Sequence, residues 1–317
     1  MKKFFTVMAP ILIMIGVAAI CIFIYMFFTN KLPKFQQGQT VQQNLPNLVS
    51  DVVLAEDELP VLDATTIVQP LMTGIVRNFT ENDNIKIDYS EDDEAYKKIL
   101  SGETDILLAN YPSSEILELA SSMGIEIEIT PVAKEALVFL VNSDNPVDDL
   151  KVSDIQKIYS GQVSNWSQIN GEDMKINAFQ NPEGTVVQSE MVNSVMKNLK
   201  MITAPNDVFY NKDFGEVSDL TAMYPNESDS IGYTFYSIAK LFYDTDETKI
   251  VNKVKMLSIN GIEANYDTIH EEKYPIITNY YLIKNKNNTS EKVQIFMDAI
   301  LSDRGKNAVK EAGYIDN

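Results

Sequence analysis

The chain has 317 residues, of which 45% are apolar, and its 26 basic and 45 acidic residues give a formal net charge of −19. Nucleic-acid binding requires a basic footprint, so this charge balance excludes nucleic acid as an expected partner. The length suits one two-lobed unit or two domains, and the apolar fraction is sufficient for a hydrophobic core. Cys21 is the only cysteine, so no intrachain disulfide can form and the core must stabilise the fold.

The N-terminal segment predicts a membrane anchor. Two lysines precede a run from Phe4 to Phe28 that carries no charge, and roughly 20 apolar residues in a helix are enough to span the hydrocarbon core. A cleaved signal peptide has a shorter apolar region of about 7–15 residues, followed by small residues at the cleavage site. Cleavage or lipidation at Cys21 is the alternative, although Ile20 stands where a small residue is needed.

The N-terminal lysines favour the orientation in which the rest of the chain lies outside the membrane. We therefore expect a single-pass cell-membrane protein whose C-terminal domain is extracytoplasmic. Four segments are expected: an anchor over residues 1–30, a linker over 31–58, one lobe made of 59–141 and 280–317, and a second lobe made of 142–279.

Strand and helix signals alternate from residue 60 onward. The first half predicts a strand at 60–64, a helix at 66–79, a strand at 85–89, a helix from a Ser90–Asp93 capping box to Gly102, a strand at 105–109, a helix from Ser113 to Gly124, and strands at 126–129 and 136–141. The second half predicts a helix from Ser153 to Gly161, a strand at 175–179, a helix at 185–199, strands at 231–235, 254–258 and 280–283, and a helix at 290–312. This order predicts an α/β fold with a largely parallel sheet.

Two such lobes joined by two long strands enclose a cleft, and the joining strands near Val141 and Tyr281 are the expected hinges. In open α/β sheets, ligands bind at the carboxyl ends of the strands, often on helix N-termini. The sequence therefore predicts a ligand site between the lobes.

Residues suited to catalysis or metal binding are scarce. His270 is the only histidine, and nothing near it resembles the nucleophile turn of a hydrolase, so we expect it to be a surface residue. A zinc site needs several His or Cys ligands, and glycine-rich phosphate loops are absent from the sequence. We expect no enzyme activity, no metal and no cofactor.

The sequence resembles the phosphate-binding proteins of bacterial ABC importers, which have the type II periplasmic-binding-protein fold. The resemblance extends from Leu62 to Ile315 and depends on the order and spacing of six stretches. These are 62–71 (LDATTIVQPL), 105–113 (DILLANYPS), 155–166 (IQKIYSGQVSNW), 231–233 (IGY), 274–275 (YP) and 312–314 (AGY).

The resemblance implies that hydroxyl and N–H groups at helix N-termini hold a small oxyanion. The residues that match the family's binding positions are Thr65, Thr66, Asn110, Thr185 and Gln188. Simple helix capping is the alternative role for Thr65 and Thr66. The family predicts a monomer that meets an ABC importer permease.

The stretch 181–188 (NPEGTVVQ), which corresponds to the family's third binding site, departs from the family pattern. Asn181 stands in place of an arginine, Val186 in place of a glycine and Val187 in place of a residue with a hydroxyl. A hydrogen bond to a charged group contributes roughly 1.5–3 kcal/mol. Losing two therefore lowers the affinity by about two to four orders of magnitude, if the family geometry is retained.

The sequence is compatible with two functions. The first is a membrane-anchored extracytoplasmic solute-binding protein that delivers phosphate or a related small oxyanion to an ABC importer. The second is a degenerate solute-binding domain that acts as an extracytoplasmic sensor or scaffold without transport, which the valines at positions 186 and 187 favour.

Overall fold

The computed structural model describes residues 53–80, 85–181, 183, 185–203, 228–244 and 254–317. The predicted anchor, Cys21 and most of the predicted linker lie outside the described residues. Within the described ranges, no helix is long and apolar enough to cross a membrane. All of the described residues belong to one compact unit, Val49–Asn317.

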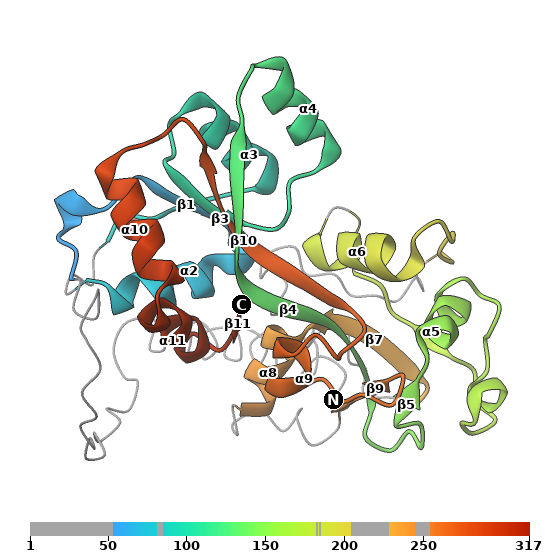
Figure 1. The fold of residues 1–317 in the computed structure, drawn as a ribbon. Coiled ribbons are helices and arrows are strands. Elements are labelled where there is room, and N and C mark those ends of the chain that lie inside the picture. The colour runs from blue at the N-terminus through green and yellow to red at the C-terminus, as the bar shows by residue number, and fades with distance from the viewer. Residues whose placement is uncertain (1–52, 81–84, 182, 184, 204–227, 245–253) are drawn as a thin grey trace, which may run out of the picture. The chain divides into compact units, whose positions relative to one another are not determined.

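Helices and strands alternate in the first half of this unit (Figure 1). The elements are η1 (Glu56–Glu58), β1 (Leu62–Thr65), η2 (Thr66–Val68), α2 (Gln69–Asn78), β2 (Asp88–Ser90), α3 (Asp92–Ser101), β3 (Ile106–Ala109), α4 (Ser114–Ser122), β4 (Ile127–Asn142), β5 (Asp149–Leu150) and α5 (Val152–Tyr159).

The second half continues the alternation and ends with two helices and a short strand. The elements are η3 (Trp166–Ile169), β6 (Asn177–Ala178), α6 (Val186–Glu190), the π-helix η4 (Met191–Met196), β7 (Ser230–Phe235), α8 (Tyr236–Asp244), β8 (Val254–Met256), β9 (Ser258–Ile259), α9 (Tyr266–His270), β10 (Ile277–Asn285), α10 (Glu291–Leu301), α11 (Asp303–Glu311) and β11 (Ile315–Asp316).

One mixed sheet has the strand order β2-β1-β3-β10-β4-β7-β6, with β8 and β11 also paired to β4. The outer strands are parallel, because β1 pairs in parallel with β2 and β3, and β6 pairs in parallel with β7. The central strands β10 and β4 are antiparallel to their neighbours. The predicted α/β class is confirmed, but the prediction of a largely parallel sheet is right only for the outer strands.

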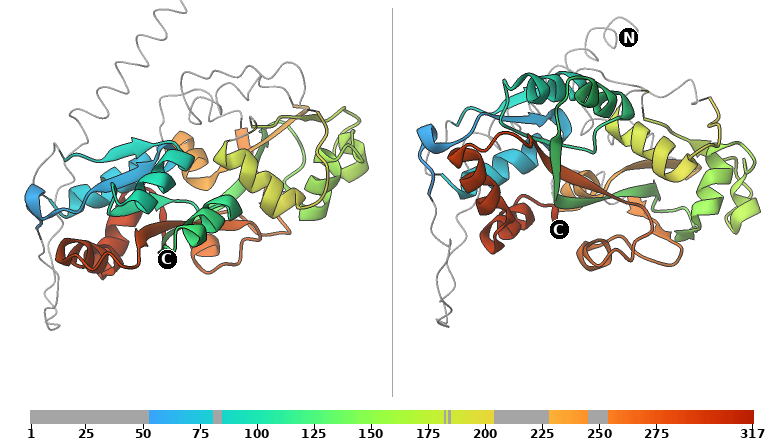
Figure 2. Two further views of the ribbon diagram at one scale, coloured as in Figure 1. Left: turned by 90° about the horizontal axis from the view of Figure 1, so that it is seen from above. Right: turned by 45° about the horizontal axis from the view of Figure 1, so that its top comes forward.

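The core consists of separate clusters, which define two lobes. We call β1–β3, α2–α4, α10 and α11 the first lobe, whose apolar side chains form two clusters. We call β5–β7, β9, α5, α6, α8 and α9 the second lobe, whose side chains form one larger cluster. Helix α11 packs on α2 and α10 in the first lobe (Figure 2). The two-lobed architecture that the sequence predicts is therefore present.

Several predicted helix starts are correct, and others are wrong. The Ser113 hydroxyl accepts the N–H of Ile116 at 3.3 Å and caps α4, as expected. Ser90, in contrast, ends β2 and donates its hydroxyl to Asp63, so the predicted capping box does not form. Ser153 lies inside α5, whose N-cap is Lys151.

Two longer predictions differ from the structure. The strands expected at 126–129 and 136–141 form the single strand β4, because its polar middle residues find partners. The helix expected at 290–312 divides into α10 and α11 at Ser302, whose hydroxyl accepts the N–H of Gly305. A Cβ added at Gly305 would lie 1.9 Å from the carbonyl oxygen of Ile300, so this tight junction requires glycine.

A buried carboxylate on β11 connects the two lobes. Asp316 is 4% exposed and accepts the hydroxyl of Tyr266 on α9. Lys310 Nζ, from α11, lies 3.4 Å from Asp316 Oδ2, and His270 Nε2 lies 3.9 Å from Oδ1. Burial by itself raises the pKa of Asp316, but the bonds from Tyr266 and Lys310 and the nearby positive charge hold the pKa below its usual value.

A second buried carboxylate, Glu135, joins β4 to the start of α8. Its Oε1 accepts the main-chain N–H groups of Ala136 at 2.9 Å and Ser237 at 3.2 Å, and its Oε2 accepts the Ser237 hydroxyl. Burial raises the pKa of Glu135 to about 7, and the hydrogen bonds from Ser237 and Ala136 offset only part of this effect. The native chain therefore binds a proton at Glu135 more readily than the unfolded chain does.

The raised pKa of Glu135 predicts how stability depends on pH. The native pKa of about 7 exceeds the ordinary 4.5. The contribution of Glu135 to the free energy of unfolding is therefore fully present below about pH 4.5 and is lost as the pH rises through 7. The shift corresponds to about 3 kcal/mol. We expect Glu135→Gln to flatten the fall in the free energy of unfolding across this window, as measured by urea denaturation at several pH values.

The matched control is Glu128→Gln on the same strand, where the carboxylate is half-exposed and pairs with Lys284 at 3.1 Å. We expect this variant to keep the wild-type pH dependence. If Glu135→Gln also kept it, Glu135 would not be the titrating group.

Candidate functional site

The carboxyl ends of three parallel strands meet at one edge of the first lobe. Thr65, the last residue of β1, lies opposite Ser90, the last residue of β2. The pairing of β1 with β3 runs to Ala64 and Leu108, and Asn110 directly follows the end of β3. The structure therefore brings Thr65 and Asn110, which the sequence predicts as ligand-binding residues, to the same sheet edge.

Thr65 sits at the N-terminus of a helical segment without capping it. Its backbone has φ −66° and ψ 151°, and its side chain makes no capping hydrogen bond to η2. The side chain is 1% exposed, and its Oγ1 atom has no hydrogen-bond partner. The alternative role of Thr65 as a helix cap is therefore not observed. Thr66, the first residue of η2, is exposed.

Asn110 carries a second polar atom of this kind. Its Oδ1 is buried and lacks a hydrogen-bond partner, while its main-chain oxygen accepts the hydroxyl of Tyr96 from α3. Among the residues that the structure describes, Thr65 Oγ1 and Asn110 Oδ1 are the two buried side-chain oxygen or nitrogen atoms without a hydrogen-bond partner. Buried polar groups in native proteins are nearly always satisfied, so two at one strand edge indicate a ligand site.

The second-lobe residues that the sequence predicts are satisfied within that lobe. Thr185 is the N-cap of α6 and accepts the N–H of Gln188 at 3.3 Å. The Gln188 side chain accepts the hydroxyl of Tyr233 and contacts Met201 Sδ at 3.6 Å. The polar groups of these two residues therefore have partners apart from any ligand.

The three departures from the family pattern also have structural roles. Val187 is 0% exposed and belongs to the second-lobe cluster, and Val186 packs against it. The Asn181 side chain donates to the main-chain oxygen of Tyr233 at 3.0 Å. Val187 thus faces the core, which differs from the expectation that this position faces a ligand.

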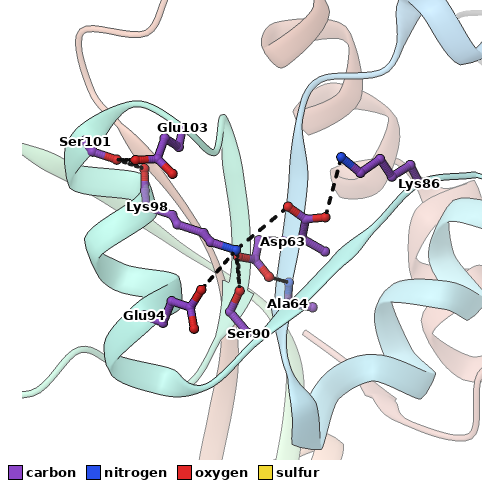
Figure 3. Close-up of polar contacts among 9 residues, drawn as sticks. Asp63, Ala64, Lys86, Ser90, Glu94, Lys98, Ser101 and Glu103 are labelled. Carbon is purple, nitrogen blue, oxygen red and sulfur yellow. Dashed lines mark hydrogen bonds and ion pairs between the residues drawn. The ribbon is translucent and has the colours of Figure 1, made fainter.

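Sequence reasoning missed a charged network around Asp63, which precedes Thr65 by two residues on β1 (Figure 3). Asp63 is 0% exposed and accepts the N–H of Ala64 and the hydroxyl of Ser90, each at 2.8 Å. Lys98 Nζ donates to Ser90 Oγ at 2.9 Å and lies 3.7 Å from Asp63 Oδ2. An acid inside an apolar strand was the available signal, because a buried carboxylate needs donors or a cation.

Lys98 is held among several carboxylates. Besides Asp63, its Nζ lies 3.5 Å from Glu94 and 3.8 Å from Asp88. Burial lowers the pKa of Lys98, but Asp63, Glu94 and Asp88 outweigh burial and keep the pKa above its ordinary value. The positive charge nearest to Ser90 is therefore already compensated by this network.

These features define a two-lobed α/β protein with a polar site at the strand ends of its first lobe. Residues 61–304 match the PBP superfamily domain, so the chain belongs to this superfamily. The resemblance to the phosphate-binding proteins of ABC importers is confirmed at the level of the family.

Sequence relatives are identical to the chain at about a quarter of the aligned residues. The phosphate-binding protein PstS of Borreliella burgdorferi is 26% identical over 190 residues, which span 59% of this chain and 64% of the relative. PstS of Staphylococcus saprophyticus is 25% identical over 264 residues, which span 80% of this chain and 78% of the relative. The match thus covers less than two thirds of the first relative's length.

The fold is similar to that of solved structures. An ABC-type phosphate transport receptor from Vibrio cholerae aligns over 80% of this chain and 99% of the receptor, with a TM-score of 0.61 and 18% identity. At this identity the likeness concerns the fold alone.

The unpartnered hydroxyl of Thr65 predicts that Thr65→Val stabilises the chain. Leaving a buried donor unsatisfied costs about 1–3 kcal/mol, so removing the hydroxyl raises the free energy of unfolding by about 1 kcal/mol. Thr185→Val is the matched control, because it removes a capping hydroxyl and costs about 1 kcal/mol. Urea denaturation of the full-length chain in detergent measures both changes. Equal destabilisation by the two variants would contradict the assignment of Thr65.

Proposed function

We propose that the chain is a membrane-anchored extracytoplasmic solute-binding protein that takes phosphate or a related small oxyanion and delivers it to an ABC importer. The pair of unpartnered buried atoms, Thr65 Oγ1 and Asn110 Oδ1, carries this proposal. The names of the relatives, phosphate-binding protein PstS, support the ligand class. Phe4–Phe28 is the proposed anchor, and the chain is proposed to act without enzyme activity or cofactor.

The two atoms differ in what they can offer to a ligand. The Thr65 hydroxyl can donate a hydrogen bond to an oxyanion, whereas Asn110 Oδ1 can only accept one. A ligand that satisfies both therefore carries a negative oxygen and a protonated oxygen. Inorganic phosphate keeps a proton at neutral pH and meets this condition, whereas sulfate has no proton to donate.

The second lobe adds less to such a site than the family pattern implies. Thr185 and Gln188 already have partners within the lobe, and Asn181 bonds to Tyr233 instead of supplying a cation. The proposed binding mode therefore depends mainly on the first lobe. The expected affinity is lower than that of a site with donors from both lobes.

The same observation favours a second candidate function. A second lobe in which Thr185, Gln188 and Asn181 already have partners suits a solute-binding domain that works as an extracytoplasmic sensor or scaffold. The buried Val187 supports this candidate as well, because it contributes to the core and offers no hydrogen bond.

Calorimetric titration of the full-length chain in detergent separates the two candidates. We expect heat from phosphate binding at fixed ionic strength and an affinity for sulfate lower by roughly 10- to 100-fold, since one charge-assisted hydrogen bond is lost. Thr65→Val should weaken phosphate binding by a similar factor. No heat up to millimolar phosphate would rule out phosphate delivery and favour the sensor or scaffold.

A substitution at Val186 tests the contribution of the second lobe. Val186→Gly removes the side chain from the first residue of α6 and lets a ligand approach the main-chain N–H groups. We expect stronger phosphate binding in the calorimetric titration. Val187→Ser is the contrast, because its hydroxyl enters the core and lowers the free energy of unfolding by about 1–3 kcal/mol without improving affinity. Unchanged affinity in Val186→Gly would mean that α6 does not face the ligand.

A further inference from the structure

Helix α3 makes polar contacts with two of the strands that form the site, β1 and β2, and with the residue that follows the third, β3. Ala95, Tyr96 and Ile99 seat the helix on the sheet, since they share a buried cluster with side chains of β3. The helix also makes polar contacts outside this cluster. The Tyr96 hydroxyl donates to Asn110, the residue after β3, and Lys98 contacts Asp63 on β1 and Ser90 on β2. One helix therefore contacts β1, β2 and the residue after β3.

The bond from Tyr96 fixes the main chain at Asn110. Tyr96 is 5% exposed, and its hydroxyl donates to the Asn110 carbonyl oxygen. Burial raises the pKa of Tyr96 far above its ordinary value, and Asp92 and Tyr281 raise it further, so the hydroxyl keeps its proton. Because Asn110 follows the end of its strand, no ladder hydrogen bond of β3 fixes its peptide group.

The contacts of Lys98 fix the backbone beside Thr65. Ser90 lies directly opposite Thr65 in the pairing of β1 with β2, and Asp63 precedes Thr65 by two residues on the same face of β1. Lys98 Nζ bonds to Ser90 Oγ, which in turn donates to Asp63 Oδ2 (Figure 3). The network therefore sets the spacing of β1 and β2 at the position of Thr65.

We propose that α3 is the positioning element of the ligand site, in which Tyr96 orients Asn110 and Lys98 orients Thr65. Neither side chain needs to touch the ligand for this role. The part of the proposal that concerns affinity rests on the proposed function, whereas the effect on the two strand ends does not.

A tyrosine of the other lobe provides a matched control for Tyr96. Tyr274 is 2% exposed, and its hydroxyl donates to the main-chain oxygen of Leu137 at 3.2 Å. Tyr96→Phe and Tyr274→Phe thus each delete one buried hydroxyl-to-carbonyl bond, with similar costs to global stability. Only Tyr96→Phe should alter the ligand site.

Lysine 98 has its control on the same helix. Lys98→Met removes the cation that holds Asp63 and Ser90, whereas Lys97→Met changes the exposed neighbour. If Lys98→Met fails to fold because Asp63 becomes an uncompensated buried charge, Tyr96→Phe still decides the proposal.

The experiment measures hydrogen exchange and phosphate binding on the full-length chain in detergent. We expect Tyr96→Phe to accelerate exchange at residues 109–112 and Lys98→Met at residues 63–66, while Tyr274→Phe and Lys97→Met leave both segments unchanged. We expect phosphate affinity to fall about tenfold in Tyr96→Phe, and not in Tyr274→Phe.

If hydrogen exchange at residues 109–112 were no faster in Tyr96→Phe than in Tyr274→Phe, the proposed role of Tyr96 would be overturned, whatever the ligand. Altered exchange with no phosphate binding by the wild-type chain would instead overturn the proposed function and leave the positioning role intact. Altered exchange with unchanged phosphate affinity would show that Tyr96 has only a structural role.

Discussion

Strand β4 hydrogen-bonds to β10, β11, β7 and β8 and carries side chains into the cores of both lobes. Its partners change between Ala136, which pairs with β10, and Leu137, which pairs with β7. Two charged residues lie just before this change. The Lys134 ammonium donates to the carbonyl of His270, and Glu135 holds the start of α8. Both lobes therefore take their position from one strand.

Much of the fold could be predicted because its signals are local. Local strand signals located β1, β3 and β7, and Ser113 marked a helix start correctly. The errors arose where a distant partner decided the outcome. Ser90 bonds to Asp63 across the sheet, and the charged pair in β4 is satisfied by α8 and by the C-terminal end of α9. No window of sequence contains both members of such pairs.

The candidate site shows the same division. Thr65 and Asn110 could be selected because strand ends and family motifs are visible in sequence, and the structure places them at the ends of adjacent strands. The roles of Gln188 and Val187 could not be predicted. They depend on which face of α6 packs against the core and on a hydrogen bond from the distant Tyr233 hydroxyl. Among the described residues, the first lobe thus has two unsatisfied buried polar atoms, whereas Thr185 and Gln188 find partners within the second lobe.

The contacts of Asp316 also constrain how the lobes can move. The strand that carries Asp316 pairs with β4 at Ala133 and Lys134, close to the position where β4 changes partners. If the lobes rotate about this position, the Tyr266–Asp316 bond moves less than the outer ends of the lobes, because it lies near the axis of the rotation. The contacts of Asp316 are therefore compatible with such a rotation.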